Sequence, residues 1–251
     1  MTKIIVLAAG KGSRMKSDLP KVLSPINGKP MIEYLINSVM RLGVDPEPVL
    51  VVSPDNKEII ADNLRKYKLS FALQAEQLGT GHAVASARSL IPEEVKNIMV
   101  LYGDHPFITP KSIERLLESH KSEVSMMTAE VSDFSEWRKN FYYWGRILRS
   151  NNKIEKIIEF KDASDEIKEV KEVNPAIFCF NKNWLLENIA KIKNENNNKE
   201  YYLTDLIKMA FEQGIEINSS TIEAQEAVGI NSPEELKVAQ DLAENNIFDE
   251  V

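Results

Sequence analysis

A glycine-containing segment near the start of the chain gathers residues that could hold a phosphate. It spans residues 7–23, LAAGKGSRMKSDLPKVL, and follows the apolar run of residues 4–6. Small residues let backbone N–H groups approach anionic oxygens, and cations neutralise the charge on those oxygens. The cations of this segment are Lys11, Arg14, Lys16 and Lys21. The pattern predicts a phosphate-binding loop, and the simpler alternative is a solvated loop whose charges are incidental.

Two common phosphate-binding motifs are excluded. Residues 10–12 begin like the dinucleotide fingerprint G-x-G-x-x-G, but Met15 stands where the third glycine belongs. A Walker A loop needs Ser or Thr after its Gly-Lys pair, whereas Gly28-Lys29 is followed by Pro30. The loop therefore predicts neither a dinucleotide cofactor nor P-loop chemistry.

The elements that would position this loop follow a regular order in the first half of the chain. Apolar runs that predict strands occupy residues 3–8, 48–52, 70–73 and 98–102. One helix is expected between Pro30, at its first turn, and Gly43, just past its end, and another begins at Thr109-Pro110. This alternation is typical of βαβ units around a mainly parallel sheet.

The second half is less regular. Strands are predicted at residues 123–131, 153–160 and 172–180. A helix over residues 232–247 is indicated by the capping box Ser232…Glu235, with Pro233 at the first helical position. With 251 residues, the chain is long enough for one large domain with a smaller lobe.

Composition excludes several classes of protein. A net charge of -7 argues against a nucleic-acid polymer as partner, since such a partner needs a basic face. Cys179 is the single cysteine and excludes a disulfide scaffold, while His82, His105 and His120 lack the spacing of zinc ligands. No signal peptide and no apolar run of about 20 residues is present, so we expect a cytoplasmic protein that does not contact a membrane.

Segments along nearly the whole chain, in order, carry a resemblance to a known family. They are LAAGKGSRM…LPKVL, LQAEQLGTGHAV, LYGDHPFI, WGRI, IIEFKDA, EVNPAIFCF, EYYLTDL and AVGINSPEEL. Together they resemble the uridylyltransferase half of the bacterial bifunctional N-acetylglucosamine-1-phosphate uridylyltransferases. The resemblance implies an α/β, Rossmann-like nucleotidyltransferase fold, with a mixed, mainly parallel sheet flanked by helices and a small sugar-binding lobe. It also implies one domain over residues 1–251, with a nucleotide-binding part of about 1–110 and a sugar-binding part of about 111–230.

The reaction of the family joins UTP to a sugar 1-phosphate and releases pyrophosphate, with N-acetylglucosamine 1-phosphate as the first candidate acceptor here. Uracil presents an acceptor–donor–acceptor edge, so the side-chain amide of Gln74 could pair with it in bidentate fashion. The resemblance implies that further nucleotide contacts come from Leu7, Ala8, Gly10, Gly79 and Thr80. No general base is required, because a phosphate ester dianion is already nucleophilic, and catalysis would come from positioning and charge neutralisation.

Charge neutralisation is assigned to a few groups. Asp104 follows a predicted strand, at the end where open α/β sheets place their ligands. Mg²⁺ takes few carboxylates and completes its shell with substrate phosphates. The resemblance makes Asp104 and Asn231 the Mg²⁺ ligands, and we expect Arg14 at the β- and γ-phosphates and Lys21 at the α-phosphate and the attacking phosphate.

The resemblance implies that the sugar is bound by Gly145, Glu159, Asn174 and Thr204. Carboxylate and amide groups suit sugar hydroxyls and an N-acetyl group. The chain departs from the family here: the usual Asn-Thr-Gly is Asn174-Pro175-Ala176, and Trp144 replaces a tyrosine. Tyr201 and Tyr202 are candidates for stacking beside the sugar, with packing as the expected role of one of them.

Alternatives remain open at the level of sequence. A cytidylyl- or thymidylyltransferase of the same architecture is possible, because uracil and thymine share one hydrogen-bonding edge. A catalytically silent nucleotide-sugar sensor is the alternative from another class. The hexapeptide repeats of the family's acetyltransferase half are absent from these 251 residues, so we expect no acetyltransferase activity. The sequence specifies no oligomeric state.

Overall fold

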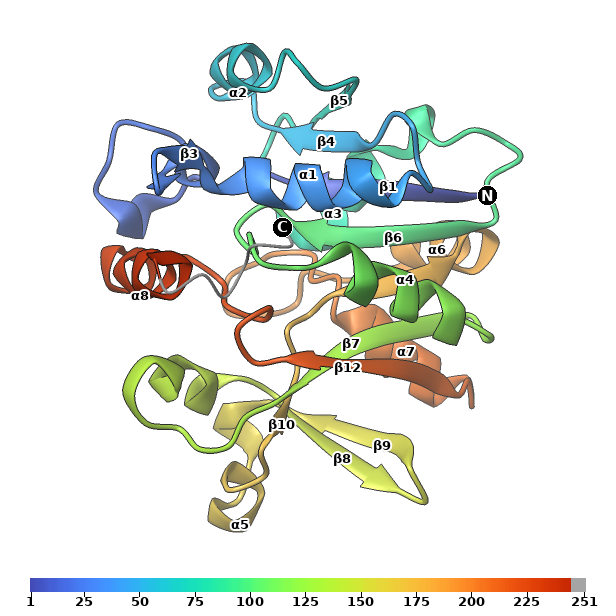
Figure 1. Cartoon of the computed structure of the whole chain (residues 1–251). Coiled ribbons are helices and arrows are strands. Elements are labelled where there is room, and N and C mark those ends of the chain that lie inside the picture. Colours follow the sequence, from blue (N-terminus) through green and yellow to red (C-terminus); the bar gives the residue numbers. More distant parts are fainter. Residues whose placement is uncertain (245–251) are drawn as a thin grey trace.

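A mixed sheet of ten strands runs through the centre of the molecule in the computed structural model, which describes residues 1–244 (Figure 1). Its strands are β1 (Thr2–Leu7), β4 (Val49–Val52), β5 (Ser70–Leu73), β6 (Asn97–Tyr102), β7 (Val124–Glu130), β8 (Arg146–Ser150), β9 (Lys153–Ile158), β10 (Glu172–Val173), β11 (Phe178–Asn181) and β12 (Ile217–Glu223). Their order is β5-β4-β1-β6-β11-β7-β10-β8-β9, and β12 pairs with β7. A separate small hairpin joins β2 (Pro25–Ile26) and β3 (Lys29–Pro30).

The first half of the sheet is parallel. Strands β5, β4, β1 and β6 lie side by side, with Leu7 paired to both Val51 and Tyr102. Their carboxyl ends therefore meet at one edge of the sheet. The four strands predicted in this half of the chain are confirmed, each within one residue at either end.

Antiparallel pairs occur in the second half, which makes the sheet mixed, as expected. The single strand predicted over residues 172–180 is wrong, because it is broken into β10 and β11. Pro175 removes a backbone donor and Ala176 takes a positive φ of 61°, so the ladder cannot continue through them. Strand β12 is not predicted by the pattern because its sequence, INSSTIE, is mostly polar.

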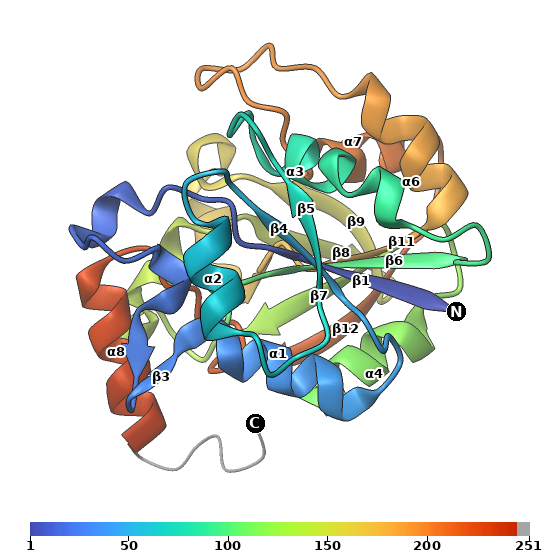
Figure 2. The ribbon, with the colours of Figure 1, turned by 90° about the horizontal axis from the view of Figure 1, so that it is seen from above.

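Helices cover both faces of the sheet. The α-helices are α1 (Met31–Leu42), α2 (Lys57–Asn63), α3 (Thr80–Ser86), α4 (Pro110–Ser119), α5 (Asp165–Lys168), α6 (Lys182–Asn188), α7 (Asp205–Glu212) and α8 (Pro233–Glu244). Helices α1 and α4 lie on one face, and α3, α6 and α7 lie on the other (Figure 2). Short 3-10 helices include η1 (Ser13–Met15) and η2 (Lys21–Leu23) in the glycine-containing loop and η4 (Glu136–Tyr143) between β7 and β8.

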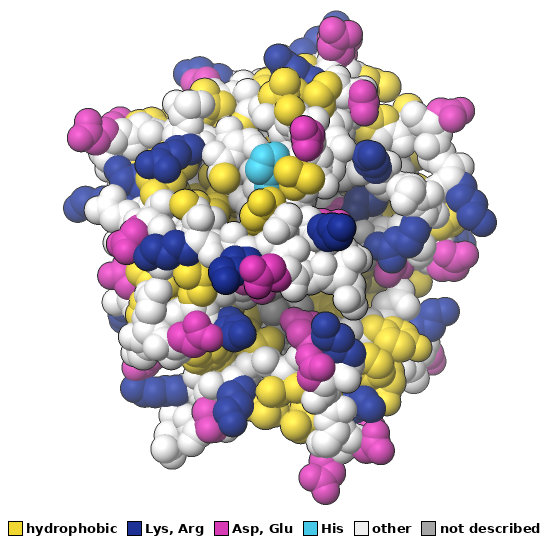
Figure 3. Space-filling model, turned by 180° about the vertical axis from the view of Figure 1, so that it is seen from behind, with side chains coloured by type: hydrophobic (Ala, Val, Ile, Leu, Met, Phe, Trp, Pro, Cys, Tyr) yellow, Lys and Arg dark blue, Asp and Glu magenta, His cyan; other side chains and the backbone are white. Residues whose placement is uncertain are grey.

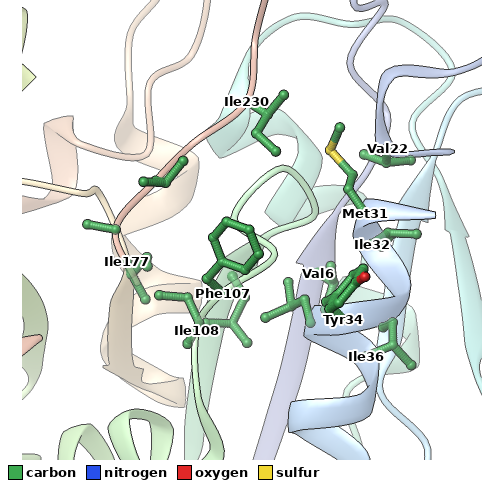
Figure 4. Close-up of a cluster of buried hydrophobic side chains, with 14 of the residues drawn as sticks. Val6, Val22, Met31, Ile32, Tyr34, Ile36, Phe107, Ile108, Ile177 and Ile230 are labelled. Atoms are coloured by element: carbon green, nitrogen blue, oxygen red, sulfur yellow. The ribbon is translucent and has the colours of Figure 1, made fainter. Parts of the chain in front are cut away.

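Successive side chains of a strand point to opposite faces of the sheet, and each face of the sheet carries its own hydrophobic core. In β1, Ile4 and Val6 belong to the core under α1 and α4, whereas Ile5 belongs to the core under α3, α6 and α7. Figure 4 shows the first core, where Phe107 and Ile108, just beyond β6, lie near Tyr34 of α1. Because both cores contact the strands of the parallel half, the loops at its carboxyl edge start from fixed positions.

The predicted end of α1 and the predicted starts of α4 and α8 are confirmed, whereas Pro30 ends β3 and precedes α1 instead of lying in its first turn. Gly43 follows α1 with φ of 70°, and the Thr109 hydroxyl accepts a hydrogen bond from the Ser112 backbone N–H at the start of α4. At α8, the Ser232 hydroxyl accepts from the Glu235 N–H, and the Glu235 carboxylate accepts from the backbone N–H of Asn231. Helix α8 is described to Glu244, so the predicted residues 245–247 lie outside the described part of the chain.

The hydropathy of the helices and the charge of the face seen in Figure 3 bear on possible partners. Among residues 1–244, every helix is too short or too polar to cross a membrane. On that face, Lys and Arg side chains are interspersed with Asp and Glu (Figure 3). The charge is therefore mixed rather than concentrated there.

Candidate functional site

Two cavities lie beside each other at the carboxyl edge of the parallel strands. One has a volume of about 940 Å³ and is lined by the loops after β1 and β5. The other has a volume of about 1050 Å³. It is lined by residues 143–145, 159–162 and 174–176 and by residues around α7. The two cavities share Tyr102, Asp104 and Asn231 in their walls. Two ligands bound in these cavities would therefore meet at Asp104 and Asn231.

The smaller cavity collects every residue that the sequence assigned to the nucleotide and its phosphates. These residues are Leu7, Ala8, Gly10, Arg14, Lys21, Gln74, Gly79 and Thr80. Backbone hydrogen bonds hold the strand ends that carry them: the Gly103 N–H donates to the Leu7 carbonyl at 2.9 Å, and the Gln74 N–H donates to the Val52 carbonyl at 2.8 Å. The arrangement thus follows from the register of the parallel strands.

Gly12 allows the first loop to fold back on itself. Its φ is +60°, and a Cβ atom at this position would lie 2.6 Å from the Cβ atom of Lys21. Only glycine fits both the left-handed backbone and the close approach. The Lys21 side chain lies in the wall of the cavity, which the exposed Arg14 also lines.

Gln74 is buried in the wall of the same cavity, with only 3% of its surface exposed. Its amide nitrogen donates to the Gly79 carbonyl at 3.0 Å and lies 3.2 Å from Nδ1 of His82. Its side-chain oxygen accepts no hydrogen bond from the described residues. The loop therefore holds the amide in one orientation and leaves its acceptor available to a ligand.

Gly79 is sterically required in the second loop. Its φ is +106°, and a Cβ atom would lie 2.6 Å from the backbone oxygen and 2.8 Å from the backbone nitrogen of Tyr201. We expect Gly79→Ala to lower the free energy of unfolding by about 2–4 kcal/mol, because it adds overpacking to backbone strain. Urea unfolding measures this change.

Gly10→Ala is the matched control for Gly79→Ala, since a Cβ atom at Gly10 meets nothing within 4 Å. Its effect on unfolding should stay within about 0.5 kcal/mol. Equal stabilities of the two variants would contradict the close packing of Gly79 against Tyr201.

The larger cavity collects the four residues assigned to the sugar, Gly145, Glu159, Asn174 and Thr204. A Cβ atom on Gly145 would lie 3.6 Å from both carboxylate oxygens of Glu159, so these residues face each other closely. The Asn174 N–H donates to the Gly145 carbonyl at 3.0 Å, which joins the two segments. Glu159 is exposed toward the cavity, but burial of its other side by protein raises the pKa of its carboxyl group.

Arg146 supports the aromatic segment that borders this cavity. It is fully buried, and its guanidinium donates to the carbonyls of Phe141, Tyr142 and Trp144 and to that of Lys168. Several backbone acceptors are thus satisfied by one side chain. These hydrogen bonds hold residues 141–144 in place, although their sequence is an irregular aromatic run.

The backbone of Ala176 is strained at the edge of the larger cavity. Its φ of 61° lies in the left-handed region, which disfavours a residue with a Cβ atom. We expect Ala176→Gly to raise the free energy of unfolding by about 0.5–1 kcal/mol. Chemical denaturation measures the difference.

Ala163→Gly is a suitable control, because Ala163 has an ordinary φ of -82°. There the substitution should lower stability by about 0.5–1 kcal/mol. A loss of stability in both variants would show that the backbone at Ala176 costs nothing.

Lys21 joins the two predicted Mg²⁺ ligands at the junction of the cavities. Its ammonium lies 2.5 Å from Oδ2 of Asp104 and 2.7 Å from Oδ1 of Asn231. The backbone N–H of Ile230 donates to the Asp104 carbonyl at 3.0 Å, which ties the loops of Asp104 and Asn231 together. Burial disfavours the charged form of Asp104, but the attraction of Lys21 and His105 and the hydrogen bond from Lys21 together lower the pKa of the carboxyl group.

The chemistry of these donors fits Mg²⁺. Oδ1 of Asp104 is buried and accepts no hydrogen bond from residues 1–244. A buried carboxylate oxygen without a donor is unfavourable unless a cation or ligand satisfies it. Carboxylate and amide oxygens are hard donors of the kind that Mg²⁺ takes, and their small number leaves room for phosphate oxygens.

Sequence reasoning missed two side chains at this junction. Tyr102 ends β6 and lines both cavities, and burial strongly raises the pKa of its hydroxyl. His105 is buried beside Asp104, with its Nε2 3.9 Å from Oδ1 of Asp104. Their position next to Asp104 at the carboxyl end of a strand was the signal that could have found them.

The two tyrosines considered for stacking have different surroundings. Tyr202 lines the larger cavity. The backbone of Tyr201 instead pairs with residues 78–81, with the Gly81 N–H donating to the Tyr201 carbonyl at 2.8 Å. Tyr201 therefore has the packing role that was expected of one member of the pair.

Known proteins resemble this chain over nearly all of its length. The bifunctional protein GlmU of Clostridium beijerinckii is 37% identical over 246 residues, which are 97% of this chain and 52% of that protein. The bifunctional protein GlmU of Caldicellulosiruptor saccharolyticus is 40% identical over 238 residues, 94% of this chain and 50% of that protein. The chain thus spans about half the length of these relatives, and the resemblance to one half of a bifunctional protein is confirmed.

Solved structures share the fold at low sequence identity. A UDP-glucose pyrophosphorylase complexed with UDP-glucose superposes with a TM-score of 0.74 at 18% identity, covering 98% of this chain and all of that one, 100%. The inositol-1-phosphate CTP transferase from T. maritima gives a TM-score of 0.71 at 19% identity, covering 96% of each chain. These matches confirm the Rossmann-like fold.

The family profile that matches is the MobA-like NTP transferase domain, over residues 4–202. The match covers most of the chain and includes both loops of the smaller cavity. The chain belongs to the family of MobA-like NTP transferase domains.

Proposed function

We propose that the chain transfers UMP from UTP to a sugar 1-phosphate, most directly N-acetylglucosamine 1-phosphate, and releases pyrophosphate. The observation that carries this proposal is the pair of cavities that share Asp104 and Asn231, with Lys21 between them. A nucleotide in the smaller cavity and a sugar phosphate in the larger one would bring their phosphates together there. The similarity to one half of the GlmU proteins supports the same assignment.

The nucleotide part is assigned to about residues 1–110. The side-chain oxygen of Gln74, left free by the hydrogen bond of its nitrogen to Gly79, accepts from the N3–H of uracil. Cytosine carries an acceptor at that atom, so its binding would leave Gln74 unpaired. The remaining contacts to base, ribose and backbone are assigned to Leu7, Ala8, Gly10, Gly79 and Thr80.

The phosphates are assigned to the first loop and to the junction. An oxygen of the sugar phosphate attacks the α-phosphorus of UTP, and the bond from that phosphorus to the β-phosphate oxygen breaks. Lys21 stabilises the charge on the α-phosphate and the attacking phosphate, and Arg14 stabilises the leaving pyrophosphate. Asp104 and Asn231 would hold Mg²⁺, which when bound supplies further neutralisation of phosphate charge.

The sugar part is assigned to about residues 111–230. Gly145 gives the sugar access to the backbone, and Glu159, Asn174 and Thr204 present polar groups to its hydroxyls and to an acyl substituent. A partly buried carboxyl with a raised pKa, as at Glu159, is stabilised when a hydroxyl donates to it. Ligand binding at Glu159 should therefore be favourable.

A panel of substrates tests the proposal. The purified chain is incubated with Mg²⁺, one of UTP, dTTP, CTP or ATP, and one of several sugar 1-phosphates, and the release of pyrophosphate is measured. We expect the fastest release with UTP and N-acetylglucosamine 1-phosphate. Faster release with CTP or dTTP would move the assignment to another nucleotidyltransferase, and no release with any pair would contradict it.

A further inference from the structure

Lys21 bonds to both of the residues that are proposed to hold a divalent ion. Its ammonium is bonded to one oxygen of Asp104 and one oxygen of Asn231, at 2.5 and 2.7 Å. The side chains of Lys21 and Asp104 are each only 13% exposed, so the contact is partly shielded from water. An ammonium group held by both oxygens supplies a positive charge between them.

An Mg²⁺ ion bound to both residues would lie close to this ammonium. Mg²⁺ binds oxygen at roughly 2.0–2.1 Å, and the ammonium lies 2.7 Å from Oδ1 of Asn231. An ion on that oxygen would therefore be at most about 5 Å from the lysine nitrogen, whichever oxygen of Asp104 it takes. Like charges at such short range repel strongly even in a polar environment. While the Lys21 ammonium stays at Asp104 and Asn231, it therefore opposes the binding of a divalent ion to both residues.

The base of the Lys21 side chain limits where its ammonium can go. The close approach of Gly12 to the Lys21 Cβ atom fixes the start of the side chain. Lys21 lines the smaller cavity together with Arg14 and Lys11. Moving the ammonium into that cavity brings it toward two other cations, which is unfavourable until an anion is present.

We propose that Lys21 is the resident cation of the metal site, and that a divalent ion binds Asp104 and Asn231 only after a nucleotide has drawn Lys21 away. This inference rests on the proposed function, in which the triphosphate enters the smaller cavity. The phosphates give the ammonium new anionic partners, and the two oxygens become free in the same step. Nucleotide and metal would then bind as one coupled event, and the protein alone would bind metal weakly.

Mn²⁺ binding to the full chain without nucleotide tests this inference. Free Mn²⁺ is measured by electron paramagnetic resonance during titration of the wild type and of Lys21→Met, which has a side chain of similar length without charge. We expect Lys21→Met to bind Mn²⁺ about tenfold more tightly or better, because its repulsion is gone. Lys21→Arg should bind as weakly as the wild type, and adding Asp104→Asn to Lys21→Met should abolish the gain.

Lys11→Met is the matched control, because it removes the same charge from an exposed position in the same loop. Thermal unfolding verifies that each variant is folded, and Lys21→Gln repeats the test if Lys21→Met is not. In water proton relaxation measurements, the wild type should form a ternary complex with Mn²⁺ once a non-transferable α,β-methylene analogue of UTP is added.

The outcomes separate this inference from the proposed function. Equal Mn²⁺ affinities of Lys21→Met and Lys11→Met overturn the inference, even if the chain transfers UMP. Tighter Mn²⁺ binding by Lys21→Met supports the inference, even if the substrate panel shows no transfer and the proposed function falls. Tight Mn²⁺ binding by the wild type in the absence of nucleotide also overturns it.

Discussion

Replacing Asp104 by asparagine is expected to lower kcat/KM for UMP transfer by about 10²–10³-fold. The substitution keeps the size of the side chain but removes the negative charge that pairs with Lys21 and fits Mg²⁺. Asp104 also lines both cavities, so its loss affects the place where the two phosphates would meet in the proposed reaction. The rate of pyrophosphate release under matched substrate concentrations measures the effect.

Asp18→Asn is the control for Asp104→Asn, because it removes a carboxylate from an exposed position in the first loop. That variant should keep its rate within about twofold, since exposed charges contribute little. Turnover of Asp104→Asn close to that of the wild type would remove Asp104 from the reaction.

Lys21→Met is expected to lose about 10²–10³-fold in kcat/KM for the same reaction. The lysine is the one side chain that contacts both Asp104 and Asn231 in the described part of the chain. Its charge is assigned to the α-phosphate and the attacking phosphate, whose repulsion it would reduce in the transition state. Steady-state kinetics with saturating Mg²⁺ measure the loss.

The stability of Lys21→Met must be followed alongside its rate. Removing one partner of a partly buried ion pair leaves the charge of Asp104 without its cation, and this lowers the free energy of unfolding. Chemical unfolding distinguishes a folded, inactive variant from an unfolded one. Lys11→Met should lose less than about tenfold in rate, and a folded Lys21→Met with normal turnover would exclude the assigned role.

The first half of the fold could be predicted because its signals are local. The strands are short apolar runs, and the helix ends at Gly43 and Thr109 are set by residues next to them. The prediction of the second half failed where tertiary contacts decide the structure. Strand β12 is polar and is held by its pairing with β7, and the break at Ala176 requires a backbone angle that its residue type disfavours.

The site could be predicted in its residues but not in its contacts. The rule that parallel strands present ligands at their carboxyl ends brings Leu7, Gln74 and Asp104 to one edge. The contacts of Lys21 with Asp104 and Asn231 span 83 and 210 positions along the chain. No local pattern carries information over such separations, and the sequence therefore did not reveal that a lysine lies between the two proposed metal ligands.

The hydrogen bond from Ile230 to Asp104 has a consequence for a chain that is still being made on the ribosome. The strands that carry the nucleotide loops emerge early and can pair among themselves. Asn231, which belongs to the wall of both cavities, emerges long after those strands. A growing polypeptide thus completes the junction of its two cavities only after residue 231 has left the exit tunnel, so shorter products of synthesis would lack that junction.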